Sequence, residues 1–162
     1  MELALDELRV LTGWAADCAA RVLPLVPDPR PAAAIAAARE FASGGPRTRA
    51  LRTAAWEALA ASRTPDPAAA AAARAAVGVA GAAYLHPLES PHQVKHIVGP
   101  AQQAALAREL AGGSASDEVA WALSQAPREV SEILRKFPPG KPGKTRLGEL
   151  HRQLEAALRG RS

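Results

Sequence analysis

The amino-acid sequence predicts an all-α protein, organised as a single-domain, alanine-rich bundle of about six to eight helices. Apolar residues recur at helical spacing, and no segment shows the alternation of branched and aromatic residues that marks β-strands. Hydrophobic residues make up 48% of the 162 residues but aromatic residues only 4%. The core must therefore be built largely from alanine, and small side chains predict helices that pack closely together.

The first two predicted helices are separated by a proline-rich corner. In residues 3–23, apolar side chains at positions 5, 8, 11 and 15 share one helical face, and Pro24 and Pro27 end the segment. The sequence "VPDPRP" then forms a tight turn. Pro31 suits the first turn of a second helix, which runs to Gly44-Gly45.

The third and fourth predicted helices are joined by the segment "RTPDP". The third spans about residues 47–62, and Asp66 is a good N-cap for the fourth, with Pro67 at its first helical position. The fourth helix runs to about Leu85. Its alanine content resembles a membrane span, but Arg74 lies within it and alanine is barely apolar enough to drive insertion, so a buried core helix is expected.

The fifth predicted helix repeats the cap-then-proline signal at Ser90-Pro91 and runs to about Ala111. Gly99-Pro100 is expected to kink it, because an internal proline removes one backbone donor and clashes with the preceding turn. After Gly112-Gly113, Ser116 is expected to cap a short sixth helix that ends at Leu123.

The two remaining helices, residues 128–137 and 146–159, lie in a basic C-terminal region. From Pro127 onward there are nine basic and four acidic side chains, whereas the preceding 126 residues carry a net charge of −1. We therefore expect residues 1–126 to form the core of the bundle and residues 127–162 to form a basic helical region that packs on the same domain.

Composition also bears on location and on catalysis. The single cysteine, Cys18, excludes an internal disulfide and a multi-thiolate metal site, and it fits a reducing cytoplasm. No signal-peptide pattern is seen, so a cytoplasmic protein without a membrane contact is expected. No serine lies in a Gly-x-Ser-x-Gly context, and Cys18 lies inside an apolar helical pattern, which makes nucleophilic catalysis improbable. The favoured role of the three tryptophans, Trp14, Trp56 and Trp121, is to anchor the small-residue core, and the alternative is that one of them lines a groove.

Three of the four histidines, His86, His92 and His96, lie within eleven residues. A continuous helix would place His92 and His96 on one face, as in many helical zinc sites, with His86 in the preceding turn and Glu89 or Asp17 as a carboxylate. However, the His-Glu-x-x-His signature is missing, and Lys95 adds an unfavourable charge. Capping or hydrogen-bonding histidines are therefore the favoured interpretation, and a zinc site is the alternative.

Asp17 also has two interpretations. It precedes Arg21 by four residues, the favoured order for an ion pair within one helix. Alternatively, its carboxylate meets His86 or His96 and holds the imidazole in one tautomer. The ion pair with Arg21 is the favoured interpretation.

The segment "PPGKPGKTR" resembles a phosphate-binding loop, but Pro138 stands where that motif needs glycine and no strand precedes it. We expect an exposed basic linker with solvated Lys136, Lys141, Lys144 and Arg146. Such a linker suits an acidic protein or nucleic acid. Nucleic acid is disfavoured, because stacking aromatics and an arginine-lined groove helix are missing.

Two blocks of sequence resemble a known family. They are "WAADCAARVLPLV" and, after it, "DPRPAAAIAAAREFASG", and they resemble the immunity proteins of bacterial polymorphic toxin systems described as similar to immunity protein five. The resemblance covers about residues 5–111. The matching positions are Asp17, Cys18, Ala19, Arg21, Val22, Leu23, Arg30, Pro31, Ala34, Ile35, Ala38 and Arg39, and His86 and His96 resemble the histidine segment of the family.

The resemblance implies a non-catalytic protein that neutralises a cognate toxin by binding it directly. We therefore predict a protein partner, plausibly such a toxin, with Asp17, Arg21, the three histidines, Lys141, Lys144 and Arg146 as candidate binding residues. No catalytic residue and no cofactor are assigned. The alternative is a metal-dependent enzyme or ligand-binding protein that uses His86, His92 and His96.

Overall fold

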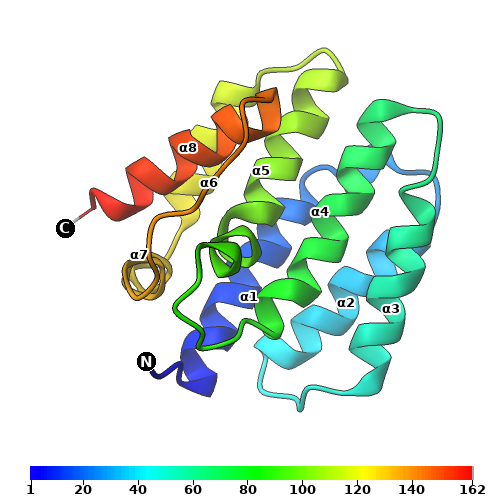
Figure 1. The fold of residues 1–162 in the computed structure, drawn as a ribbon. Helices are drawn as coiled ribbons and strands as arrows, with labels where there is room; N and C mark the ends of the chain where they lie inside the picture. The colour runs from blue at the N-terminus through cyan, green and yellow to red at the C-terminus, as the bar shows by residue number, and fades with distance from the viewer. Residues whose placement is uncertain (162) are drawn as a thin grey trace.

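The computed structural model describes residues 1–161, and within that range the chain contains helices and no strand. The predicted all-α fold is confirmed. Two short 3₁₀ helices accompany eight α-helices (Figure 1). In chain order the helices are α1 (Leu5–Ala20), η1 (Leu23–Leu25), α2 (Arg30–Ala42), α3 (Arg49–Ala61), α4 (Pro67–Ala83), η2 (Pro91–Gln93), α5 (Val94–Leu110), α6 (Ala115–Gln125), α7 (Arg128–Arg135) and α8 (Arg146–Arg159).

Helices α4 and α5 lie side by side at the centre of the bundle (Figure 1). Helix α3 flanks α4, and α8 flanks α5 on the other side. Helix α1 packs against both of them from behind, and α2 packs on α1, α3 and α4. Helix α6 packs on α5 and α8, and α7 packs on α1 and α8. The molecule thus presents a face on which four helices stand next to one another.

Capping side chains set several of the observed boundaries. Asp66 accepts a hydrogen bond from the Ala68 amide at 3.1 Å and caps α4 as predicted. Ser90 accepts one from the His92 amide at 3.2 Å, but it caps η2 rather than α5. The prediction for the sixth helix is wrong: Ser114, not Ser116, accepts from the Asp117 amide. Gly112, with φ of 90°, turns the chain after the end of α5. Helix α6 begins at Ala115, two residues earlier than a cap at Ser116 would give.

Alanine allows α4 and α5 to approach closely. Most of α4 is buried, and its alanines present only a methyl group to their neighbours. At Gly78 even a methyl group would be crowded, because a Cβ atom there would lie 3.2 Å from Cγ of Pro100 in α5. Helix α5 continues through Pro100 as one helix, and the kink expected there stays a prediction.

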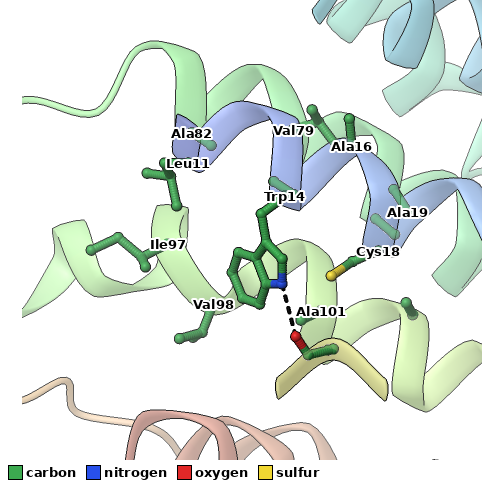
Figure 2. Close-up of a cluster of buried hydrophobic side chains, with 14 of the residues drawn as sticks. Leu11, Trp14, Ala16, Cys18, Ala19, Val79, Ala82, Ile97, Val98 and Ala101 are labelled. Atoms are coloured by element: carbon green, nitrogen blue, oxygen red, sulfur yellow. Dashed lines mark hydrogen bonds between the residues drawn. The ribbon is translucent and has the colours of Figure 1, made fainter. Parts of the chain in front are cut away.

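The interior between α1, α5 and α6 is built around Trp14. Its indole extends from α1 toward Ile97, Val98 and Ala101 of α5, and its Nε1–H donates to the carbonyl of Ala122 in α6 at 2.9 Å (Figure 2). Cys18 is buried beside it, and burial raises the pKa of the thiol. Cys18 is therefore a packed, protonated core residue, in agreement with its predicted inertness.

Specific contacts attach the basic C-terminal region to the rest of the bundle. Lys136 forms an ion pair with Glu7 of α1 at 3.0 Å. The linker between α7 and α8 is also held: the Gly140 amide donates to both carboxylate oxygens of Glu155, and Arg152 donates to the Gly143 carbonyl. Since these contacts fix it against α8, the linker forms a defined part of the molecular surface.

Taken over residues 1–161, no helix combines the length and the apolar character that a bilayer crossing requires.

Candidate functional site

The structure does not bring the three predicted histidines together as ligands. His86 and His92 are exposed, and His96 is half-buried. Within residues 1–161, no three His, Cys, Asp or Glu side chains are placed so that they could hold a metal ion. The physical reason is local: His92 lies in η2, whose turn is tighter than that of an α-helix, so the four-residue spacing no longer aligns it with His96.

His96 has a structural environment of its own. Its ring packs against Gly81 of α4, where a Cβ atom would lie 2.8 Å from its Nδ1 atom. Burial lowers the pKa of His96 below its ordinary value, and the nearby His86 and Lys95 lower it further. At neutral pH this imidazole is uncharged.

Asp17 and Arg21 do not pair with each other, so the favoured interpretation of Asp17 is wrong. The Asp17 carboxylate binds Arg39 of α2 at 2.8 Å, and Arg21 binds both carboxylate oxygens of Glu118 in α6 at 3.0 Å. The Arg21 guanidinium also lies over the ring of Trp121, 4.2 Å from its centroid. Partners on other helices outcompete the neighbour within α1. These motif residues therefore join α1 to α2 and to α6.

The predicted basic linker is only partly free. Arg146 is not solvated as expected, because it forms ion pairs with Glu109 at 2.8 Å and with Glu149 at 3.0 Å. Lys136 is also paired, with Glu7. Lys141 and Lys144 are exposed and form no ion pair with residues 1–161. Of these two, Lys141 contributes to the groove described next.

An open groove of about 910 Å³ crosses the face formed by α3, α4, α5 and α8. Helices α4 and α5 form its floor, α3 forms one wall, and the linker with the start of α8 forms the other. In Figure 1 this is the face on which α3, α4, α5 and α8 stand next to one another. The lining residues are Arg52, Ala55, Trp56, Leu59, Arg74, Val77, Gly78, Ala80, Gly81, Tyr84, Lys95, His96, Gly99, Gln102, Gln103, Lys141, Pro142, Gly143, Thr145, Leu147, Gly148 and His151.

The charge of the groove is entirely of one sign. Arg52, Arg74, Lys95 and Lys141 are exposed at its surface, and no aspartate or glutamate is among the lining residues. None of these four cations forms an ion pair with residues 1–161. Arg52 instead lies over the ring of Tyr84, 4.6 Å from its centroid. The groove therefore attracts negatively charged groups.

An apolar floor and an exposed tryptophan accompany these charges. Trp56 of α3 is 71% exposed and lines the groove, so for this tryptophan the alternative role holds and the core role does not. Gly99 of α5 leaves open space in the groove, because a Cβ atom there would meet no atom within 4 Å. Val77 and Leu59 add aliphatic surface. The groove combines an apolar recess with a cationic rim.

His151, which sequence reasoning did not single out, also lines the groove. It is 3% exposed, and its Nε2 atom lies 2.9 Å from Oε1 of Glu155. Glu155 also accepts from the Gly140 amide and from Arg159. Burial alone would raise the pKa of Glu155, but these hydrogen bonds hold it below its usual value. The four-residue spacing of His151 and Glu155 was the available sequence signal.

The fold and the groove define a helical bundle with an open basic groove on one face. Residues 2–129 match the family described as "Imm-5 like putative immunity protein", and the chain belongs to this family. Searches of curated proteins and of solved structures give no match. The matched segment extends from α1 into α7 and includes the floor and the α3 wall of the groove, whereas the linker and α8 follow it in the chain.

Proposed function

We propose that this protein is an immunity protein that neutralises a cognate toxin by binding it directly, without catalysis. Membership of the Imm-5-like family supports the immunity role. The observation that carries direct binding is the exposed Trp56 beside unpaired cations at the rim of an open groove. Tryptophan and arginine are the residue types that dominate binding energy in protein interfaces, and an apolar recess offers room for an anchoring side chain of the partner.

Co-expression in a bacterial host tests this function. The probe is the toxin domain encoded beside the gene for this chain, expressed from an inducible promoter with and without the chain. We expect growth to stop with the toxin alone and to be restored by the chain. Co-purification of the two proteins and a dissociation constant from calorimetry would establish contact. Growth arrest that the chain does not relieve would contradict the proposal.

Titration of the purified toxin separates binding from catalysis. A binding protein removes toxin activity linearly and reaches completion near one equivalent, because each molecule can occupy only one toxin. An enzyme that destroys the toxin or its product would act at far lower ratios and with time. We also expect no change when a chelator is added. Complete neutralisation by a small fraction of one equivalent would overturn the non-catalytic proposal.

A further inference from the structure

The groove is cationic without internal compensation, although acidic side chains lie close to it. Glu155, which is hydrogen-bonded to the lining residue His151, is already occupied by Gly140 and Arg159. Glu109 and Glu149 are both bound to Arg146. These three carboxylates thus have partners outside the groove, whereas the four cations within it form no ion pair with residues 1–161.

The apolar part of the groove limits what can fill it. There is open space above Gly99, and Val77 and Leu59 line the same groove, with Trp56 on the α3 wall. Burying an apolar side chain there would remove apolar surface from water on both partners, whereas a purely charged ligand would leave that recess empty or wet. The best-matched occupant therefore carries both carboxylates and an apolar side chain.

A protein segment fits these features better than a nucleic acid. Single-stranded nucleic acids bind proteins through successive aromatic platforms on which bases stack. Here Arg52 already lies over the ring of Tyr84, so Trp56 is the one aromatic lining residue without a guanidinium over its ring within residues 1–161. Carboxylates interspersed with an aliphatic or aromatic side chain satisfy both the rim and the recess.

We infer that the groove between α3, α4, α5 and α8 receives an acidic segment of the toxin. Its carboxylates pair with Arg52, Arg74, Lys95 and Lys141, and one apolar side chain enters the recess above Gly99. This inference rests on the proposed function, because the occupant belongs to the toxin. The cations steer the toxin to the groove, and the recess fixes its register.

Carbodiimide cross-linking of the wild-type complex tests the location. The reagent joins a lysine amine to a carboxylate in direct contact, and this chain has four lysines. Lys95 and Lys141 line the groove, whereas Lys136 and Lys144 do not. We expect mass spectrometry to find Lys95 and Lys141 joined to aspartates or glutamates of the toxin. Lys136 should join Glu7 of its own chain, an internal positive control at 3.0 Å. Toxin links at Lys144 alone, with no toxin link at Lys95 or Lys141, would overturn the inference.

A charge-reversal pair tests the energetics. Arg52→Glu/Arg74→Glu should weaken binding at least about 100-fold, because it places like charges against the toxin segment. The matched control is Arg49→Glu/Arg63→Glu, which makes the same change in net charge outside the groove. Both arginines are exposed and form no ion pair with residues 1–161, so this pair should weaken binding less than about threefold. Circular dichroism and thermal unfolding verify that both variants fold. Equal effects of the two pairs would contradict a docking site in the groove.

A steric variant separates the recess from the charges. Gly99→Leu adds a side chain whose Cβ atom meets no atom within 4 Å, and it leaves every charge in place. We expect at least about tenfold weaker binding with an unchanged salt dependence, since only the apolar anchor is displaced. The arginine pair should instead flatten the dependence of binding between about 0.05 M and about 0.5 M salt. Unaltered affinity of a folded Gly99→Leu protein would remove the recess from the inference.

These experiments distinguish two kinds of failure. If the wild-type chain does not bind or neutralise the toxin, the proposed function and this inference fail together. If it neutralises the toxin while the Arg52/Arg74 variant does so equally well, only the groove is wrong. A labelled single-stranded oligonucleotide is the competing probe: tight binding that the same variant abolishes, with no displacement by the toxin, would assign the groove to nucleic acid and overturn the inference.

Discussion

Glu118 links three helices through a single carboxylate. Its side chain is 7% exposed, and it accepts hydrogen bonds from Arg21 of α1 and from Arg108 of α5. Burial alone would raise the pKa of Glu118, but the two arginines outweigh burial and hold the pKa below its usual value. The carboxylate is therefore ionised in the native protein. Arg108 also donates to the Arg21 carbonyl, so the network includes the end of α1.

Neutralising this carboxylate should destabilise the fold. We expect Glu118→Gln to lower the free energy of unfolding by about 1–3 kcal/mol, because hydrogen bonds to charged groups are lost in a largely buried site. Urea denaturation should show a lower midpoint with an unchanged slope. Glu132→Gln is the matched control, since Glu132 forms an exposed pair with Arg128 and should change stability by less than about 0.5 kcal/mol. Equal midpoints for the two variants would contradict this assignment.

At the scale of the single element, small differences in helix start decide which side chains share a face. The sequence correctly identified Asp66 and Ser90 as capping residues, because capping depends on a few adjacent residues. It did not reveal that the first turn after Ser90 is a 3₁₀ helix. That turn separates His92 from His96, although their spacing suggested a pair of ligands.

The start of α6 offers a direct test of cap assignment. Ser114→Ala should lower the free energy of unfolding by about 1 kcal/mol, because the Asp117 amide loses its side-chain acceptor. Ser116→Ala should leave stability within about 0.5 kcal/mol of wild type, since Ser116 is exposed and lies inside the helix. Chemical denaturation of both variants under the same conditions provides the comparison. A larger effect at Ser116 would restore the original cap assignment.

For the whole molecule, the shifted titrations predict that stability falls with acidification. The Arg146 hydrogen bonds lower the pKa of Glu109, and the pKa values of Glu118 and Glu155 are also lowered. A carboxylate with a lowered native pKa stabilises the fold above its unfolded value of 4.5, and this contribution is lost as pH falls through the native pKa. The lowered pKa of His96 affects stability at a higher pH than the carboxylates do. Below the ordinary histidine pKa of 6.5, the imidazole binds a proton more readily in the unfolded chain than in the folded protein, so acidification favours unfolding.

We therefore expect a shallow loss of stability below about pH 6.5 and a steeper one below about pH 4.5. Urea midpoints measured between neutral pH and about pH 3 would trace both steps. His96→Gln should remove the upper step, and Glu118→Gln should reduce the lower one. Stability that increases on acidification, or curves that both variants leave unchanged, would contradict these assignments.

The sequence by itself determined the all-α class, eight helical segments and most of their boundaries. Helical periodicity, prolines and caps act over a few neighbouring residues, so they can be recognised without a fold. The predicted last helix, residues 146–159, coincides with α8 for this reason. The buried, unreactive environment of Cys18 likewise followed from the apolar pattern around it.

Only the tertiary structure decided which charged residues are paired and which are free. Arg21 pairs with Glu118, which lies 97 residues away in the chain. Arg146, at the start of α8, pairs with Glu109 of α5. The groove draws its cations from α3, α4, α5 and the linker, and its recess from glycine on α5. Such groups meet because close-packed, alanine-rich helices fix how the elements cross, and that crossing depends on contacts distributed over the whole chain.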